Sequence, residues 1–350
     1  MIKLDKCNKV YVACPYKLTS GGPETLHQLV DKLRNNNIDA YIYYFNATIF
    51  PKGSLVAEKF KKYNIKCVTK IEDSKDNVII IPEMNTELLY KFKNIKKGIW
   101  WLSFDFYERN IIKNRARFAL GKRKLPEFLW PAMIVYFTIK NRGYKQLNFS
   151  KDKDLNKYFH FYNCEYIKEL LLENKVKEER IAYLCGPIRQ SFFYDSTLSF
   201  EKENIVLYNP AKGLEFTEKI IKRMGAIEPN IKFTPLKNLT PQEIVELLKK
   251  AKLYIDFGFF PGPERIPREA VSCYCNIITS NLGSAKNDID VPIPRKYKFS
   301  PIENNIDSIC YAIIDNINNY NDYISDYDLY RKKVKDQILK FDNNIKLIFK

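Results

Sequence analysis

The chain has 350 residues, of which 45% are hydrophobic and 28% are charged, and its formal net charge is +17. This composition excludes a disordered protein, and the length favours two domains that each bury their own core. The positive charge predicts a polyanionic partner or surface, which leaves nucleic acid, anionic lipid and phosphorylated small molecules open.

In the first half, short runs of β-branched and aromatic residues alternate with amphipathic helical stretches. Apolar residues recur at helical spacing from Leu26 to Leu33, and a second helix is predicted over residues 164–174. This alternation is typical of a parallel sheet whose strands are connected by helices. The predicted strands are 10–14, 40–45, 78–81, 98–102, 158–162 and 181–184.

The second half repeats this architecture without repeating the sequence. Thr240-Pro-Gln-Glu243 is a capping box with proline at the first helical position, so a helix begins there and runs to about residue 251. Further helices are predicted over 214–224 and 267–273, and a charged helix over 323–341. The predicted strands are 205–208, 231–234, 253–257 and 276–279.

These patterns predict an N-terminal domain, a C-terminal domain and a final helix. The N-terminal domain spans residues 1–195 and carries a basic, aromatic insertion at 109–150. The C-terminal domain spans 204–320, with the boundary near 190–203. The helical segment 321–350 is expected to pack back on the N-terminal domain.

Neither a membrane span nor a metal site is expected. The longest apolar stretch, 125–139, contains two prolines and Glu127 and is too short to cross a bilayer. The eight cysteines are scattered without a C-x-x-C pair, and only two histidines accompany them. We therefore expect a cytoplasmic protein with no bound metal.

Two glycine-bearing segments each join a predicted strand to a predicted helix. Gly21 and Gly22 follow the first strand of the first half, and Lys212 and Gly213 follow the first strand of the second half. Glycine lets the backbone approach a ligand closely, and a helix N-terminus favours an anion. A lysine at such a helix start reaches a pyrophosphate as a point charge. The alternatives are a tight structural turn at the first segment and a surface Lys-Gly pair without function at the second.

A third segment, DFGFFPGPERIPREA at 256–270, follows a predicted strand and opens a short helix. Arg265 and Arg268 lie three positions apart, and guanidinium groups suit the oxygen atoms of a diphosphate. Glu269 is placed to accept hydrogen bonds from ribose hydroxyls. The alternative is a purely structural turn, which rarely needs so many prolines, glycines and charges.

Two carboxylates, Glu83 and Asp105, follow predicted strand ends in the first half, where α/β sheets place their ligands. Each is a candidate to contact a hydroxyl group of a bound ligand, and a capping or surface role is the alternative. His27 and His160 are expected to be packed histidines.

The three segments together resemble retaining GT-B glycosyltransferases of the glycosyltransferase-4-like superfamily. G-G-P-E, N-P-A-K-G and R-E-A-V-S-C-Y-C-N-I-I-T resemble three elements of that family. The likeness is greatest to capsular and surface-polysaccharide transferases that carry D-F-G-x-x-P-G-x-x-R-I-P-R-E-A and W-W-L-S, and it covers most of the chain except about 109–150. It implies an α/β fold of two Rossmann-like domains facing each other across a cleft.

The resemblance also implies residue roles. Glu269 matches the glutamate that binds the nucleotide ribose, and Lys212 with Arg265 or Arg268 matches the contacts to the donor diphosphate. The candidate catalytic residues are Asp105, from its place after a strand end, and Lys212 and Arg265, from the resemblance. The implied nucleotide- and donor-binding residues are Gly21, Gly22, Lys212, Gly213, Gly262, Glu264, Arg265, Arg268 and Glu269.

The chain departs from the family at two positions that contact the donor sugar. Pro261 stands where the family has a second glutamate, and Glu264 is the nearest acid. The stretch 100–105, WWLSFD, lacks the usual histidine. The resemblance therefore implies least about how this chain would recognise the donor sugar.

The resemblance implies a metal-independent glycosyltransferase that uses a nucleotide-sugar as co-substrate and no cofactor. The expected acceptor is a growing surface glycan or a lipid-linked glycan at the cytosolic face of the plasma membrane. The alternatives are an inactive GT-B scaffold for polysaccharide assembly and a basic nucleic-acid-binding protein, although no nucleic acid is expected because no binding module is recognisable.

The insertion contains a strongly basic segment, 109–145, that surrounds an apolar, aromatic stretch. It suits peripheral docking on an anionic membrane, and an insertion packed on the first domain with a solvated basic rim is the equal alternative.

Overall fold

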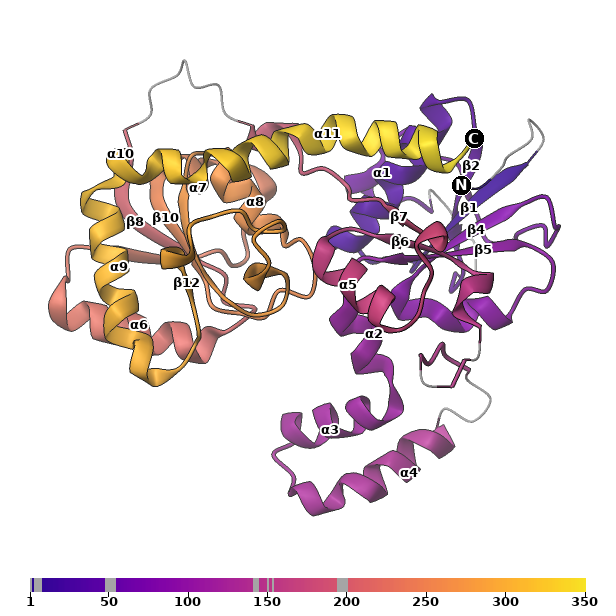
Figure 1. The fold of residues 1–350 in the computed structure, drawn as a ribbon, viewed down its shortest axis with the longest axis horizontal. Coiled ribbons are helices and arrows are strands. Elements are labelled where there is room, and N and C mark those ends of the chain that lie inside the picture. The colour runs from indigo at the N-terminus through magenta and orange to yellow at the C-terminus, as the bar shows by residue number, and fades with distance from the viewer. Residues whose placement is uncertain are drawn as a thin grey trace. The chain divides into compact units, whose positions relative to one another are not determined.

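The chain forms two compact units in the computed structural model, which describes residues 2, 8–47, 55–140, 145–149, 151–152, 154–193 and 201–350 (Figure 1). The first unit comprises Met1–Asn163, Ile167–Gly186 and Phe341–Lys350, and the second comprises Cys164–Tyr166 and Pro187–Lys340. Part of the predicted boundary at 190–203, together with Arg142 of the basic segment, lies outside the described residues. Within the described ranges, no helix is both long and apolar enough to cross a membrane.

The first unit is built on a seven-stranded parallel sheet with the order β3-β2-β1-β4-β5-β6-β7. The chain runs from β1 outward to β3, returns to the other side of β1 at β4, and continues to β7. The strands are β1 (Lys9–Cys14), β2 (Asp39–Tyr44), β3 (Cys67–Val68), β4 (Val78–Pro82), β5 (Lys96–Trp101), β6 (Phe159–Tyr162) and β7 (Ile181–Tyr183). The helices are α1 (Gly21–Asn35), α2 (Phe104–Asn110), α3 (Ile112–Lys122), α4 (Trp130–Lys140) and α5 (Glu165–Glu173).

The central strands of this sheet are apolar because both faces are covered. β4 is buried throughout, and β1 is buried from its second residue onward. On α1, Leu26, Leu29, Val30 and Leu33 are fully buried, as their helical spacing predicts. The helix thus covers the sheet with one apolar stripe.

The second unit contains a five-stranded parallel sheet with the order β12-β11-β10-β8-β9. The strands are β8 (Glu203–Tyr208), β9 (Lys232–Pro235), β10 (Ala251–Asp256), β11 (Asn276–Ser280) and β12 (Lys298–Phe299). The helices are α6 (Leu214–Ile227), α7 (Pro241–Lys250), α8 (Arg265–Ser272), α9 (Ile306–Asn318), α10 (Tyr320–Tyr323) and α11 (Asp328–Ile348), the last of which belongs to the first unit from Phe341 onward.

The predicted capping box at the start of α7 is confirmed. The Thr240 hydroxyl accepts a hydrogen bond from the Glu243 N–H at 3.3 Å, and the Glu243 carboxylate accepts one from the Thr240 N–H at 2.6 Å. Two backbone donors at the helix N-terminus are thereby satisfied.

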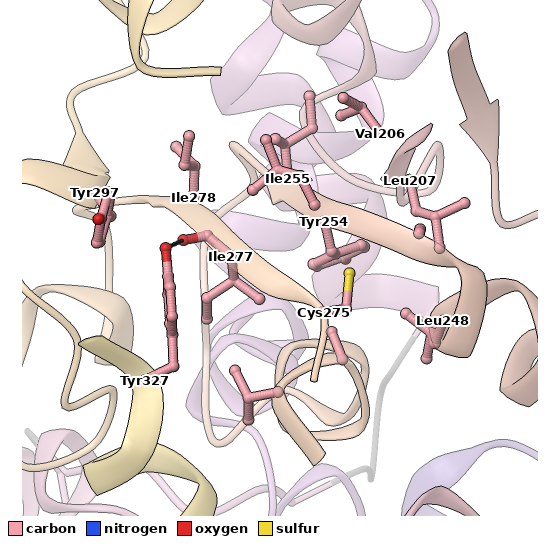
Figure 2. Close-up of a cluster of buried hydrophobic side chains, with 14 of the residues drawn as sticks. Val206, Leu207, Leu248, Tyr254, Ile255, Cys275, Ile277, Ile278, Tyr297 and Tyr327 are labelled. Atoms are coloured by element: carbon pink, nitrogen blue, oxygen red, sulfur yellow. Dashed lines mark hydrogen bonds between the residues drawn. The ribbon is translucent and has the colours of Figure 1, made fainter. Parts of the chain in front are cut away.

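The core of the second unit lies along β8, β10 and β11 (Figure 2). Leu253, Tyr254 and Ile255 on β10 are fully buried. The hydroxyl of the buried Tyr327 donates a hydrogen bond to the Ile277 carbonyl at 3.1 Å. A buried tyrosine requires such a partner, and this bond ties the segment before α11 to the sheet.

The C-terminal helix differs from its predicted extent of 323–341. It begins at Asp328 and continues to Ile348. Phe341, Ile345 and Ile348 are buried in the core of the first unit at helical spacing. Burial of this apolar stripe explains why the helix continues beyond the predicted end.

The remaining differences are elements that the sequence did not predict, and they include α2, α3, α4 and α10. β3 and β12 were not predicted, because strands of two residues are too short to show any alternation. α9 was also not predicted, although Ile309, Cys310, Ile313 and Ile317 form its buried stripe.

Candidate functional site

The second unit brings two loops together at one edge of its sheet. β8 pairs with β9 on one side and with β10 on the other. The chain therefore continues from β8 to β9 on one side of β8, and then crosses to β10 on its other side. In open α/β sheets, ligands bind at such a switch point, beyond the carboxyl ends of the strands. The loop 209–213, between β8 and α6, and the loop 257–264, between β10 and α8, both lie there.

Two glycines allow these loops to touch. Gly213 has a φ of +60°, and a Cβ atom there would lie 2.8 Å from the carbonyl carbon of Phe257. A Cβ atom on Gly258 would lie 2.5 Å from the Cβ atom of Lys212. Real Cβ atoms do not approach other atoms this closely, so each loop requires glycine at its contact with the other.

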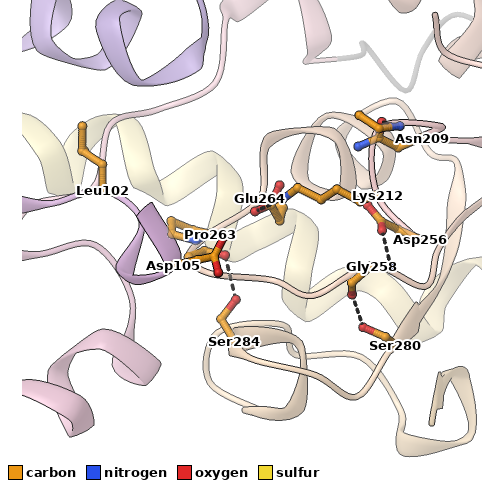
Figure 3. A network of polar contacts seen from close by, with 12 residues as sticks. Leu102, Asp105, Asn209, Lys212, Asp256, Gly258, Pro263, Glu264, Ser280 and Ser284 are labelled. Carbon is orange, nitrogen blue, oxygen red and sulfur yellow. Dashed lines mark hydrogen bonds and ion pairs between the residues drawn. The ribbon is translucent and has the colours of Figure 1, made fainter. Parts of the chain in front are cut away.

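The contact positions Lys212 against the second loop. Its Nζ atom lies 2.6 Å from Oε1 of Glu264, and both side chains are partly buried (Figure 3). Glu264 is the residue that immediately precedes α8. A lysine and a carboxylate that are distant in the sequence are therefore paired where the two helices α6 and α8 begin.

A buried carboxylate anchors the start of the second loop. Asp256 is 2% exposed and accepts hydrogen bonds from the Tyr254 hydroxyl at 2.8 Å and from the Gly258 N–H at 3.0 Å (Figure 3). Burial raises the pKa of Asp256 to about 6, although these two hydrogen bonds act in the opposite direction. The sequence indicates the place of Asp256 in the motif but not its anchoring role.

Two serines hold the same loop from the side of β11. The Ser280 hydroxyl donates to the Gly258 carbonyl at 2.5 Å, and the Ser284 hydroxyl donates to the Gly262 carbonyl at 2.7 Å. Both serines are fully buried. The sequence did not predict these two serines, because the residues around a serine do not indicate which distant carbonyl group its hydroxyl contacts.

The two arginines of α8 have different surroundings. Arg268 donates from Nε to the Glu264 carbonyl at 3.2 Å and from Nη2 to the Pro263 carbonyl at 3.1 Å, so part of its donor capacity holds the loop. Arg265 lies 3.5 Å from Oε1 of Glu269, measured from its Nε atom. Glu269 is 6% exposed. The structure thus groups Lys212, Gly213, Gly262, Glu264, Arg265, Arg268 and Glu269 on two adjoining loops and one helix.

The predicted residues of the first unit form a separate group. Gly21 and Gly22 begin α1 without a positive φ, and a Cβ atom on Gly22 would make an ordinary contact of 3.8 Å with Leu102. The local backbone therefore does not demand glycine at position 22. Asp105 lies in the first turn of α2, and its Oδ2 atom is 2.8 Å from Nε of Arg109.

Glu83 is more deeply buried than the sequence indicates. It is 2% exposed at the end of β4 and accepts a hydrogen bond from the Leu102 N–H at 2.9 Å. Burial raises the pKa of Glu83 to about 8, opposed by backbone N–H groups that include that of Leu102. The buried Glu83 carboxyl group, directly after β4, is therefore hydrogen-bonded to the backbone directly after β5.

Both histidines are buried. The Nδ1 atom of His27 lies 2.6 Å from the Pro23 carbonyl and its Nε2 atom 2.8 Å from the Tyr44 hydroxyl. The Trp101 indole N–H donates to Nδ1 of His160 at 3.1 Å. Burial lowers the pKa of each histidine to about 4. In the part of the chain that the structure describes, no three His, Cys, Asp or Glu residues are grouped to hold a metal ion.

Comparison with known proteins gives matches of structure alone. No protein-family profile matches the chain, and no curated protein matches its sequence. Sucrose-phosphate synthase from Thermosynechococcus elongatus has a TM-score of 0.61 at 11% identity, with 97% of this chain and 98% of that chain covered. HepE of Anabaena, solved with UDP-glucose, has a TM-score of 0.59 at 10% identity, with the same coverage of 97% and 98%.

A third solved structure, the glycotransferase of kitacinnamycin, has a TM-score of 0.53 at 11% identity, with 98% of this chain and 99% of that chain covered. These likenesses extend over nearly the whole length of each protein. Together with the two parallel sheets and their helices, they show that the chain has the GT-B fold of two Rossmann-like domains.

Proposed function

We propose that the chain is a glycosyltransferase that takes its sugar from a nucleotide-activated donor held by the second unit. The observation that carries this proposal is the pairing of Lys212 with Glu264 at the switch point of the sheet. A cation held on a glycine-bearing loop at this edge suits the diphosphate of a nucleotide-sugar. The solved structures of similar fold include HepE bound to UDP-glucose, which supports this ligand class.

Four of the predicted residues have a proposed role in catalysis or binding. Lys212 and Arg265 neutralise the charge that develops on the departing nucleoside diphosphate, which is the charged product of glycosyl transfer. Glu269 accepts hydrogen bonds from the ribose hydroxyls, and Arg265 is 3.5 Å from that carboxylate. Because these side chains supply the positive charge, the proposed reaction uses neither a metal ion nor a cofactor. Asp105 is proposed to contact the acceptor.

The proposed acceptor is a surface glycan of the capsule, O-antigen or lipooligosaccharide type. The resemblance of the 256–270 segment to capsular and surface-polysaccharide transferases supports it. The reaction is proposed to occur at the cytosolic face of the membrane. The first experiment therefore identifies the nucleotide base of the donor.

Thermal shift against UDP, GDP, CDP, CMP and ADP tests the donor site. A nucleotide that binds the folded protein alone raises its Tm by mass action. We expect one nucleoside diphosphate to raise the Tm of the protein and to lose this effect in Glu269→Ala. Glu218→Ala, which removes an exposed carboxylate from α6 in the same unit, is the matched control and should respond as the wild type does.

Because Glu269 is buried, Glu269→Gln provides a second variant of nearly unchanged volume. It should fold normally and still lose much of the shift, since the amide presents a donor in place of one acceptor oxygen. A folded wild-type protein that responds to no nucleotide would contradict the proposed function.

An inactive GT-B scaffold is the second candidate, favoured by Pro261. This residue is buried where the resembling enzymes have a glutamate, so the site lacks one acid for the donor sugar. Nucleotide binding without any release of nucleoside diphosphate from nucleotide-sugars, with or without glycan acceptors, would favour the scaffold over the enzyme.

A further inference from the structure

The helical hairpin formed by α3 and α4 exposes apolar side chains on a basic surface. In Figure 1 the two helices extend from α2 away from the sheet of the first unit. The main packing partners of α4 are α3 and the short 3-10 turn Glu127–Leu129. Apart from Lys140, every residue of α4 is uncharged, yet Phe137 is its single buried residue. A helix with so little polar surface normally lies in a protein core.

One apolar stripe of α4 faces α3. Trp130, Met133, Ile134 and Phe137 recur at helical spacing, and none of them is fully exposed. The Trp130 indole N–H donates to the Lys113 carbonyl at 3.0 Å, and the Arg115 guanidinium lies 5.1 Å from the centre of the Phe137 ring. Packing of this stripe against α3 holds the two helices of the hairpin together.

A second apolar stripe lies on the opposite side of α4. Ala132, Val135, Tyr136 and Ile139 also recur at helical spacing, and at about 100° per residue their mean direction is nearly opposite to the first stripe. Val135 is 57% exposed, Tyr136 47% and Ile139 68%. The stripe therefore lies in solvent, although an ordinary surface helix presents polar residues there.

The turn between the helices adds charge and an aromatic ring. Lys122, Arg123 and Lys124 are consecutive and exposed, and Phe128 is 79% exposed. From Arg109 to Lys140 the sequence has eight lysines and arginines against one acid, Glu127. Among the described residues, the three consecutive cations have no acidic partner.

We propose that this hairpin docks the protein on an anionic lipid surface. The second stripe of α4 and Phe128 enter the boundary between headgroups and acyl chains, while the flanking cations contact lipid phosphates. Nucleic acid would satisfy the cations but has no apolar phase for Val135 and Ile139. A second copy of the chain would bring an equally basic hairpin against this one, and the chain as a whole carries a net charge of +17.

The docking surface is independent of the donor site. It lies within the first unit and uses none of the residues assigned to nucleotide binding. Failure of lipid binding would therefore leave the proposed glycosyl transfer intact, and absence of nucleotide binding would leave the lipid surface intact.

Co-sedimentation of the whole chain with vesicles tests the proposal. One set of vesicles contains phosphatidylcholine alone, and the other contains phosphatidylcholine with phosphatidylglycerol. We expect binding to the second set that weakens with added salt and is at least tenfold tighter than to the first, since each cation near an anionic surface strengthens binding by about fivefold.

Two triple variants separate the contributions of charge and apolar contact. Lys122→Glu, Arg123→Glu and Lys124→Glu together should abolish the preference for anionic vesicles. Phe128→Ser, Val135→Ser and Ile139→Ser together should weaken vesicle binding by about a hundredfold, because three exposed apolar side chains lose their burial in lipid. All six positions are exposed, so both variants should keep the Tm of the wild type.

Matched controls change the same residue types elsewhere. Lys222→Glu, Lys237→Glu and Lys250→Glu make the same change of net charge on exposed sites of the second unit. Ile289→Ser, Leu329→Ser and Leu339→Ser remove exposed apolar side chains from that unit. Both controls should bind anionic vesicles nearly as the wild type does.

Three outcomes would overturn the proposal. The first is a wild-type protein that does not sediment with anionic vesicles. The second is a loss of binding that is equal in the hairpin and control variants. The third is binding of random oligonucleotides through the hairpin cations with no binding to anionic vesicles, which would assign this surface to nucleic acid.

Discussion

The Nζ atom of Lys212 lies 2.6 Å from Oε1 of Glu264, and the two residues come from loops that follow adjacent parallel strands. The pair leaves a cation and an anion together at the edge of the sheet where a donor diphosphate is proposed to bind. A diphosphate and Glu264 would compete for the same ammonium group. The two side chains are therefore expected to affect nucleotide binding in opposite directions.

The first prediction concerns this pair. Lys212→Met should weaken binding of the preferred nucleoside diphosphate by about tenfold or more, because a charged hydrogen bond to phosphate is lost. Glu264→Gln should strengthen it by about threefold to fivefold, which is the contribution of a partly exposed ion pair. Isothermal titration calorimetry measures both.

Lys219→Met is the control for this experiment. It removes another lysine of the same unit that pairs with a carboxylate, Glu303, and it should leave nucleotide affinity unchanged. If Glu264→Gln weakened binding as much as Lys212→Met, Glu264 would be a ligand contact and not a competitor.

The second prediction concerns the contact between the two loops. Gly258→Ala places a Cβ atom 2.5 Å from that of Lys212, so the loops must separate. We expect a loss of about 1–3 kcal/mol in the free energy of unfolding of the second unit, together with a loss of nucleotide binding. Chemical denaturation and thermal shift with nucleotide report the two effects.

Gly225→Ala is the matched control for the glycine contact. Gly225 lies within α6, and a Cβ atom there would meet no atom within 4 Å beyond the backbone of its own helix. Alanine is the better helix former, so this variant should be more stable by about 0.5–1 kcal/mol. A Gly258→Ala protein that bound nucleotide as the wild type does would show that the loops do not need to touch.

The third prediction concerns pH and Glu83. Its pKa is raised by burial from 4.5 to about 8, so the folded state holds a proton that the unfolded state releases between these values. The stability that this proton provides is complete below about pH 4.5 and is lost as the pH rises through about 8. Glu83→Gln keeps an acceptor for the Leu102 N–H and cannot ionise.

We therefore expect the wild type to lose stability relative to Glu83→Gln as the pH is raised from 5 to 9, by about 4 kcal/mol. Urea denaturation followed by tryptophan fluorescence measures this difference at each pH, because Trp100 and Trp101 lie in the neighbouring strand β5. A constant difference between the two proteins across that range would show that Glu83 does not titrate there.

The fourth prediction concerns the capping box of α7. Thr240→Ala removes the hydroxyl that accepts from the Glu243 N–H, and it should lower the free energy of unfolding by about 1 kcal/mol. Glu243→Gln keeps the reciprocal arrangement, since glutamine also serves in this motif, and it should remain close to wild type. Differential scanning calorimetry distinguishes them, and equal Tm values for Thr240→Ala and the wild type would contradict the prediction.

Most of the secondary structure could be predicted because its signals are local. Continuous apolar runs marked the buried strands, and the helical spacing of Leu26 and Leu33 marked α1. The Thr240 capping box marked the start of α7 within a single turn of helix. The two-residue strands β3 and β12 could not be predicted, because pairing with a neighbouring strand, and not their own sequence, defines them.

The residues proposed to bind the donor could be predicted from the sequence, but the contacts among them could not. Lys212, Gly213 and the 256–270 segment were recognised by residue type and by position after predicted strands. That Gly213 packs on the Phe257 backbone depends on the order of strands in the sheet, which places β8 beside β10. Arg268 stays a predicted diphosphate contact, and only the structure shows that its guanidinium also donates to the carbonyls of Pro263 and Glu264.

The sequence by itself determined the alternation of strands and helices, the glycine and lysine content of the loops, and the excess of positive charge, because each is a property of neighbouring residues. Only the tertiary structure decided which loops meet, how deeply Glu83 is buried, and that α4 turns a second apolar stripe toward solvent. These features depend on contacts between segments distant in the chain, and such contacts leave no local pattern in the sequence.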